Sequence, residues 1–324
     1  MKKIFIEIPT WLGDATMTTP AIENIKQTYP KSKLTIFGSY VSVKIFLKHP
    51  NIDNIIIDDS KQSFIRYQKL HKLAKEAGVF DIAFSFRRNF STKFLLFFIK
   101  TKKRFIYKRY EKNEMHQVIR YNDFINRSLN IKTQPKELKI YHKITTKKEK
   151  KILGINPGAT YGSAKRWYAL EFAKVAIKLS DKYDIKIFGG PSELDIALDI
   201  EKELIKSGTT NYENLAGKTT ITELFYHISF LDMFITADSG PMHVAAAFKV
   251  PTVSVFGPTK DTETSQWQNQ NSSILKKQFD CQPCMKRVCP LIGDKYHQCM
   301  KAIVAKDVLD TIKQIRSQND RQTT

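Results

Sequence analysis

The chain has 324 residues, a length that favours two domains over one. Hydrophobic residues make up 42% and charged residues 26% of it, which excludes disordered and fibrous proteins. The longest apolar run, FLLFFI at 94–99, is far shorter than the roughly 18–20 residues that cross a bilayer, and the start MKKIFIEIP lacks the cleavage site of a signal peptide. These features predict a cytoplasmic globular protein without a membrane span.

The formal net charge of +21 is concentrated in the first half of the chain. Residues 1–150 hold 31 basic and 13 acidic residues, which is +18, whereas residues 151–324 hold 22 and 19, which is +3. A basic surface suits a polyanionic partner such as nucleic acid, an anionic membrane or a phosphorylated glycolipid. A solvated, lysine-rich surface has the same composition, so charge alone does not identify the partner.

The spacing of apolar residues predicts strands that alternate with helices, and the pattern occurs twice. Strands are expected at 2–8, 33–37, 54–57, 81–86, 151–155, 185–188, 212–215, 233–236 and 252–256, and helices at about 14–28, 41–47, 63–77, 169–182, 192–207, 221–230, 240–248 and 305–315. The apolar period is lost between about 132 and 150, which marks a boundary between domains 1–150 and 151–324. The predicted fold class is α/β, with two doubly wound domains that bind ligands at the carboxyl ends of their strands, in the cleft between them.

The loop after the first strand, PTWLGDA, is the first candidate site. Its Asp14 lies at the start of a predicted helix, where a carboxylate can cap the helix by accepting backbone N–H groups. The alternative is a general base that takes the proton of a bound hydroxyl. The loop lacks the glycine patterns of dinucleotide-binding and P-loop sites, so it predicts neither.

A second candidate is the loop NPGATYGSAKRW at 156–167, again between a strand and a helix. Its backbone N–H groups, the Thr160 hydroxyl and the cations Lys165 and Arg166 can together hold a diphosphate. A solvated surface is the commoner place for a Lys-Arg pair, but the position between strand and helix favours a ligand contact. Glu193, in the later loop GGPSE, can accept hydrogen bonds from a ribose or a base.

The third candidate is ADSGPMHVAAA at 237–247, a buried strand end that leads into a helix of small residues. Asp238, Ser239 and the N–H groups near Gly240 lie at the N-terminus of that helix, which suits phosphate oxygens or sugar hydroxyls. His243, one turn later, is expected to face the same ligand, although a satisfied core histidine is the commoner role.

Together these segments resemble the bacterial ADP-heptose:lipopolysaccharide heptosyltransferases of glycosyltransferase family 9, type II more than type I. The similar segments follow the family's order over almost the whole chain: PTWLGDATMTTPAI, NPGATYGSAKRW, ADSGPMHVAAA, VFGPT and CQPCMKRVCP. The resemblance implies a GT-B fold, in which the first domain binds the acceptor, the second binds the nucleotide sugar, and the final helix packs back toward the first domain. The implied reaction is inverting transfer of L-glycero-D-manno-heptose from ADP-heptose to the first heptose of the Kdo–lipid A core.

The resemblance also implies roles for single residues. Asp14 is similar to the catalytic base, and Lys165 is similar to the cation that stabilises the departing ADP. Donor contacts are implied for Thr160, Lys165, Glu193, Asp238, Ser239, Gly240 and His243, and no cofactor or metal is implied for catalysis. Acceptor contacts are expected from Trp11, Gly13, Arg87, Arg88 and Lys93.

An acceptor with Kdo carboxylates and lipid A phosphates agrees with the basic first domain, and it predicts a peripheral enzyme on the cytoplasmic face of the inner membrane. Between 87 and 105, basic residues interleave with Phe94, Phe97, Phe98 and Phe105 as the expected acceptor or membrane contacts. The alternative for the phenylalanines is helix core, which we expect for at least two of them.

Four cysteines follow the spacing C-x2-C-x4-C-x9-C, namely Cys281, Cys284, Cys289 and Cys299, with His297 beside the last. In a cytoplasmic protein this spacing suggests a metal before a disulfide. One CxxC with unequal gaps is a weaker signal than two CxxC pairs, and the family's chemistry needs no metal. Both a structural zinc and free thiols therefore stay open.

Two other functions compete with this interpretation. The basic and aromatic stretch 87–110 suggests a nucleic-acid-binding protein, but no recognition module or RNP-like segment accompanies it. The second is a type I heptosyltransferase, or a related glycosyltransferase with a different sugar or acceptor, because the donor loops specify diphosphate and ribose more clearly than the sugar.

Overall fold

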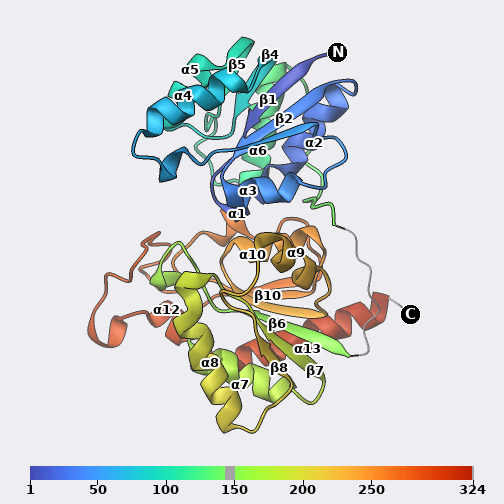
Figure 1. The fold of residues 1–324 in the computed structure, drawn as a ribbon. Helices are drawn as coiled ribbons and strands as arrows, with labels where there is room; N and C mark the ends of the chain where they lie inside the picture. Colours follow the sequence, from blue (N-terminus) through green and yellow to red (C-terminus); the bar gives the residue numbers. More distant parts are fainter. Residues whose placement is uncertain (143–149, 323–324) are drawn as a thin grey trace. The chain divides into compact units, whose positions relative to one another are not determined.

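The computed structural model describes residues 1–142 and 150–322, which form two compact units, Met1–His142 and Lys143–Thr324 (Figure 1). The sequence analysis places the boundary at 150, and residues 143–149 of the predicted linker lie outside the described residues. Within the described ranges, none of the helices is long and apolar enough to cross a membrane.

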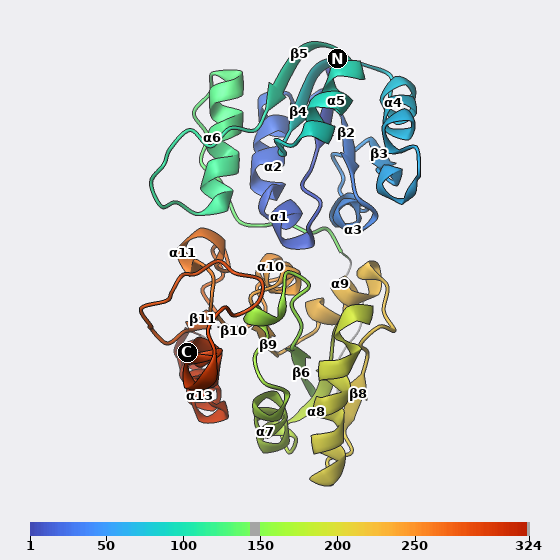
Figure 2. The same ribbon diagram turned by 90° about the vertical axis from the view of Figure 1, so that its left-hand side faces the viewer.

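The first unit is built on a five-stranded parallel sheet with the strand order β3-β2-β1-β4-β5. Its strands are β1 (Lys3–Glu7), β2 (Lys33–Gly38), β3 (Asn54–Ile57), β4 (Val79–Ser85) and β5 (Lys100–Ile106). Helices α4 (Arg66–Glu76) and α5 (Phe90–Phe98) cover one face, and α2 (Thr19–Thr28) and α6 (Gln117–Leu129) cover the other (Figure 2). Shorter helical segments are α1 (Leu12–Met17), α3 (Tyr40–Val43), Lys44–Phe46 and Ser60–Gln62.

The second unit has a six-stranded parallel sheet with the order β11-β10-β9-β6-β7-β8. Its strands are β6 (Lys151–Asn156), β7 (Tyr183–Ile187), β8 (Tyr212–Asn214), β9 (Met233–Ala237), β10 (Thr252–Val255) and β11 (Ser272–Leu275). Helices α13 (Ala305–Gln322), α7 (Ala169–Leu179) and α8 (Leu194–Lys206) follow one another over one face, and α9 (Ile221–Ser229) and α10 (Gly240–Ala247) lie on the other (Figures 1 and 2). Shorter segments are Ser163–Lys165, Pro191–Glu193, α11 (Asp261–Thr264), Gly293–Lys295 and α12 (Gln298–Lys301).

Each sheet reverses its strand order at a central pair, β1 with β4 and β6 with β9. The connections on the two sides of such a pair lead to opposite faces, which leaves a ligand-binding crevice at the carboxyl ends of the strands. The three candidate loops follow β1, β6 and β9. The sheet topology therefore places all three loops at switch points, and the predicted doubly wound α/β class is confirmed.

Three predicted helices differ from those observed. The helix expected at 41–47 is the short α3 followed by the 3-10 segment Lys44–Phe46. The helix expected over 14–28 is two helices, α1 and α2, because Pro20 lacks the N–H that would bond to the carbonyl of Thr16 and continue the first helix. The final helix is longer than expected, since α13 extends to Gln322. Its buried residues Val308 and Ile312 belong to the core of the second unit, and its packing toward the first domain stays a prediction.

Candidate active site

Asn156 joins two of the candidate loops at the switch point of the second unit. It is the last residue of β6 and pairs in register with Thr236 of β9. Its side-chain amide donates to the Ser239 hydroxyl at 3.1 Å and to the Gly158 carbonyl at 3.3 Å, and the residue is 3% exposed. The loop that follows β6 and the N-terminus of α10 are thereby fixed against each other. No role was predicted for Asn156, although a polar residue at the end of an apolar strand indicates a position at the ligand-binding edge of the sheet.

A buried ion pair connects the second and third candidate loops. Lys165 Nζ lies 2.6 Å from Asp238 Oδ2, and the two side chains are only 13% and 5% exposed. The Thr259 hydroxyl, from the loop after β10, donates to the same carboxylate oxygen at 2.5 Å. Lys165 Nζ also lies 4.7 Å from the centroid of the Tyr161 ring. The Asp238 carboxylate therefore holds the ammonium group and is itself held by the loop after β10. A cation fixed in this way can stabilise a diphosphate leaving group.

The neighbouring cations Lys165 and Arg166 contact different parts of the second unit. Arg166 turns to the start of α8, where its guanidinium donates to the Ser192 carbonyl at 3.1 Å and lies 3.4 Å from Asp195. Lys165 alone therefore contacts Asp238. The expectation that both cations hold one diphosphate stays a prediction.

Glu193 brings the loop after β7 to the loop after β6. It is 6% exposed, accepts a hydrogen bond from the Gly190 N–H at 2.8 Å, and lies 3.4 Å from the Thr160 hydroxyl. A Cβ atom on Gly158 would come within 2.1–2.5 Å of the Glu193 carboxyl group. A larger residue at position 158 would therefore require the Glu193 carboxylate to move.

We expect Gly158→Ala to lower the free energy of unfolding by about 1–3 kcal/mol, because the new methyl group must displace the buried Glu193 carboxylate. Denaturant unfolding measures this change. Gly190→Ala is the matched control, since its Cβ would meet only Glu193 Oε2, at 3.7 Å, and its φ of −76° suits any residue. Equal stability of the two variants would show that the close approach at Gly158 carries no cost.

The remaining predicted donor residues lie at the start of α10. Ser239 is the residue before the helix, and its hydroxyl interacts with Asn156 and Thr236 rather than with the helix backbone. Gly240 is the first helical residue, and His243 is buried at 4% exposure three residues later. The ligand contact expected of His243 stays a prediction.

In the first unit, Asp14 is the third residue of α1 rather than its cap. The helix begins at Leu12 and the residue before it is Trp11, so the expectation that Asp14 caps the helix is wrong. A carboxylate in the first turn is still favoured by the helix dipole. Asp14 is half-buried, and its charge adds to burial in raising the pKa of Tyr121 in α6. Trp11 is half-exposed and Gly13 is buried.

Glu7, the last residue of β1, is a buried carboxylate that the sequence analysis missed. It is 1% exposed and accepts hydrogen bonds from Ser85 at 2.5 Å, Arg87 at 3.0 Å and Thr92 at 3.2 Å. Burial raises the pKa of Glu7, and the charge of Arg87 opposes that rise. The signal was present, since Glu7 is the one acidic residue in the apolar strand KIFIEI.

The expected acceptor residues near 87–93 thus differ in their surroundings. The Arg87 side chain is 11% exposed and holds Glu7, which ties together the ends of β1 and β4. Arg88 and Lys93 are exposed. Among the neighbouring phenylalanines, Phe94 and Phe98 pack against the core of the unit, as the helix-core alternative predicts.

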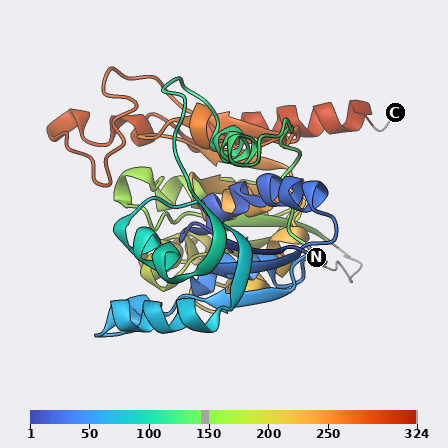
Figure 3. The same ribbon diagram turned by 90° about the horizontal axis from the view of Figure 1, so that it is seen from above.

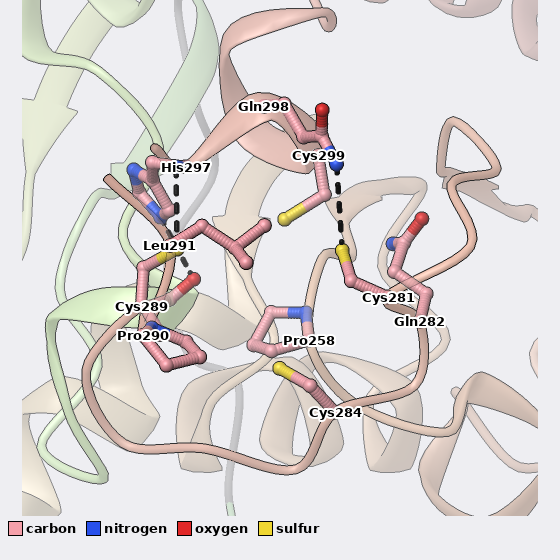
Figure 4. Close-up of a pocket in the computed structure, with 11 residues that line it drawn as sticks. Pro258, Cys281, Gln282, Cys284, Cys289, Pro290, Leu291, His297, Gln298 and Cys299 are labelled. Carbon is pink, nitrogen blue, oxygen red and sulfur yellow. Dashed lines mark hydrogen bonds between the residues drawn. The ribbon is translucent and has the colours of Figure 1, made fainter. Parts of the chain in front are cut away.

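The four cysteines line one small cavity in the second unit, and the loop that carries three of them encircles it (Figure 4). Its volume of about 20 Å³ is enough for a single water molecule. None of the four forms a disulfide, and burial, reinforced by the other three thiols, raises the pKa of Cys299 to about 11. His297 uses both ring nitrogens elsewhere, at 2.9 Å from the Ala164 carbonyl and 3.0 Å from the Tyr168 hydroxyl.

These contacts leave His297 without a ring nitrogen to offer as a ligand. Over the residues that the structure describes, no three Cys, His, Asp or Glu side chains converge as metal ligands. The structure places the cysteines around one cavity, and metal analysis of the purified protein distinguishes free thiols from a structural zinc.

The strand order of each sheet reverses at a central pair, and two parallel-sheet α/β domains of this kind form the GT-B fold. The solved structure of Escherichia coli ADP-heptose lipopolysaccharide heptosyltransferase II superposes with a TM-score of 0.80 at 20% identity, over 98% of this chain and 99% of that one. Escherichia coli heptosyltransferase WaaC with ADP-2-deoxy-2-fluoro heptose gives 0.74 at 16% identity, over 96% and 99%.

Sequence comparison identifies the family. Residues 71–295 match the model of glycosyltransferase family 9 (heptosyltransferase). The lipooligosaccharide heptosyltransferase 2 of Campylobacter jejuni serotype O:6 is 44% identical over 97% of this chain and 99% of its own length. The chain belongs to glycosyltransferase family 9, the heptosyltransferases, and it is a transferase of lipopolysaccharide or lipooligosaccharide core biosynthesis. The family match favours this function over the nucleic-acid-binding alternative.

Proposed function

We propose that this enzyme transfers L-glycero-D-manno-heptose from ADP-heptose to the first heptose of the Kdo–lipid A inner core, with inversion at the anomeric carbon. The observation that carries the donor half is the buried Lys165–Asp238 pair at the switch point of the second unit. The acceptor half is supported by the 44% identity to relatives named lipooligosaccharide heptosyltransferase 2, over nearly the whole chain.

The reaction needs a single displacement. The acceptor hydroxyl oxygen forms a bond to the anomeric carbon of heptose while its proton passes to the Asp14 carboxylate. The bond between that carbon and the β-phosphate oxygen breaks, and both of its electrons leave with ADP. The Lys165 ammonium group and the backbone N–H groups at the start of α10 stabilise the charge that develops on the phosphate.

The donor binds through polar groups at the ends of β6, β7 and β9. Thr160 and Glu193 contact the nucleotide, with the Glu193 carboxylate accepting from ribose hydroxyls. Ser239 and Gly240 contact the diphosphate, and His243 contacts the sugar. Asp238 is a positioning residue, because its carboxylate orients Lys165 and is itself held by Thr259.

Catalysis requires no metal, because Lys165 supplies positive charge at the leaving group. We expect the initial rate of ADP release to change less than about twofold in excess EDTA, since no divalent cation takes part in this electrostatic stabilisation. Loss of activity in EDTA that an added divalent cation restores would contradict this mechanism.

The acceptor is a lipid of the inner leaflet, so we propose that the enzyme works peripherally on the cytoplasmic face of the inner membrane. The support is the charge of residues 1–150, which carry +18 from 31 basic and 13 acidic residues. Kdo carboxylates, lipid A phosphates and anionic phospholipids all attract such a surface. Arg88 and Lys93 are exposed candidates for contact with the acceptor.

Acceptor specificity is tested by ADP release from ADP-heptose with two acceptors in parallel. We expect release with heptosyl-Kdo2-lipid A and none above background with Kdo2-lipid A. Release with Kdo2-lipid A alone would assign the type I reaction instead. Release with neither acceptor would indicate a related glycosyltransferase with another substrate.

A further inference from the structure

The outer surface of α4 and α5 carries large apolar side chains that stand in solvent. Phe64 is 109% exposed and Ile65 is 58% exposed, just before α4, while Phe90 and Phe97 of α5 are 68% and 73% exposed. Helix propensity does not require phenylalanine at these positions. The two helices contribute other residues to the core, namely Leu70, Ala74, Leu95 and Leu96. Most of the surface of the four exposed side chains therefore lies outside the packed core of the unit.

Ring contacts link Tyr67, Phe90 and Phe97, and the exposed Phe64 and Ile65 immediately precede α4 in the chain; we call these five residues the α4–α5 face. Helices α4 and α5 lie side by side (Figure 3; α4 light blue, α5 teal). The Tyr67 ring lies 5.7 Å from that of Phe90, and Tyr67 reaches Phe97 through a series of ring contacts: Tyr67–Phe94 at 5.1 Å, Phe94–Phe98 at 4.9 Å and Phe98–Phe97 at 5.0 Å.

The charge around this face is mainly positive. Segments 60–77 and 87–104, which contain both helices, hold 12 Lys and Arg residues and a single acidic residue, Glu76. Just outside these segments, Asp59 pairs with Lys69 and Asp81 pairs with Lys102. Lys61, Lys75, Arg88 and Lys93 are exposed. Exposed aromatic residues surrounded by cations are typical of helices that lie in the interface of an anionic membrane, where rings enter the acyl boundary and cations meet headgroup phosphates.

We propose that the α4–α5 face inserts into an anionic bilayer and anchors the enzyme beside its acceptor. The proposal rests on the proposed function, because only an enzyme with a lipid acceptor gains from such an anchor. The occupant is a bilayer rather than a protein partner because the face combines bulky apolar side chains with a net positive charge over both helices.

Vesicle binding without any acceptor tests the anchor independently of catalysis. The full chain is sedimented with vesicles of phosphatidylcholine alone or with about 30 mol% phosphatidylglycerol, a composition chosen to give a clearly negative surface potential. The test variant is Phe64→Ser with Phe90→Ser. The matched control is Leu198→Ser with Ile205→Ser, which removes two apolar side chains that are 47% and 61% exposed on α8 of the second unit.

We expect the wild-type and control proteins to bind the anionic vesicles, and the test variant to bind at least about tenfold more weakly, since two inserting rings are lost. Binding of the wild type is expected to fall as salt rises. Equal binding of test variant and wild type, or equal binding of the wild type to neutral and anionic vesicles, would overturn the proposal. Self-association of the wild type that the test variant lacks would also overturn the proposal, because the α4–α5 face would then contact a second copy of the chain.

A second readout separates this proposal from the proposed function. With a deacylated, water-soluble heptosyl-Kdo acceptor, the test variant is expected to match the wild type, whereas with acceptor in anionic vesicles its rate falls together with its binding. If the wild type is inactive on the soluble acceptor, the proposed function is contradicted. The membrane anchor is then still tested by vesicle binding, because that experiment uses no acceptor.

Discussion

Replacing Asp14 by Asn is expected to lower the rate of heptose transfer by about 10²–10⁴-fold, the usual contribution of a positioned general base. The amide keeps the shape of the side chain but cannot accept the proton of the acceptor hydroxyl. Donor binding is expected to stay unchanged, because the donor residues lie in the second unit. Steady-state ADP release and equilibrium binding of ADP measure the two quantities separately.

Asp123→Asn in α6 is the control for this prediction. Asp123 is also a partly exposed carboxylate of the first unit, but it pairs with Arg127 at 3.0 Å and belongs to no candidate loop. Its variant is expected to retain the wild-type rate. If Asp14→Asn also retained that rate, the base would have to be another group, and the role assigned to the loop after β1 would be wrong.

The second large effect is expected at Lys165. Lys165→Met removes the cation that stabilises the departing ADP, and we expect turnover to fall by roughly 10²–10³-fold, as for loss of one preorganised electrostatic contact. The same change leaves the buried Asp238 carboxylate without its ion-pair partner, and we expect a loss of about 3–5 kcal/mol in the free energy of unfolding. Turnover at saturating donor and denaturant unfolding measure these effects.

A double variant separates the two roles of Lys165. In Lys165→Met with Asp238→Asn, no unpaired charge is left in the site, so much of the lost stability is expected to return while turnover stays low. Recovery of turnover together with stability would mean that Lys165 acts only in folding. Such a result would remove the cation from the proposed mechanism.

The sequence alone predicted most of the fold, because both sheets are parallel and their strands are short apolar runs separated by helical periods. It did not predict β5 or β11. The strand β5, KTKKRFI, lies at the edge of its sheet and is mostly charged, which protects an exposed edge from pairing but removes the apolar signal. It also missed the break between α1 and α2, where a proline within a helical pattern should have counted against a single helix.

The candidate loops were predictable because strand ends at a switch point are where ligands bind. The pairing of Lys165 with Asp238 was not, because it joins residues 73 positions apart whose contact depends on the order of β6 and β9. Glu7 and Arg87 illustrate the same limit. Their ion pair joins the ends of β1 and β4, and it places inside the unit an arginine that its sequence neighbours suggested was exposed.

In a single displacement the acceptor hydroxyl attacks as ADP departs, and the anomeric carbon is inverted. The configuration of the new glycosidic bond reports this inversion. We would determine that configuration by NMR on the product formed from ADP-heptose and a deacylated heptosyl-Kdo acceptor. We expect an anomeric configuration opposite to that of the donor. A product that retains the donor configuration would contradict it, because retention cannot arise from one displacement with Asp14 as the base.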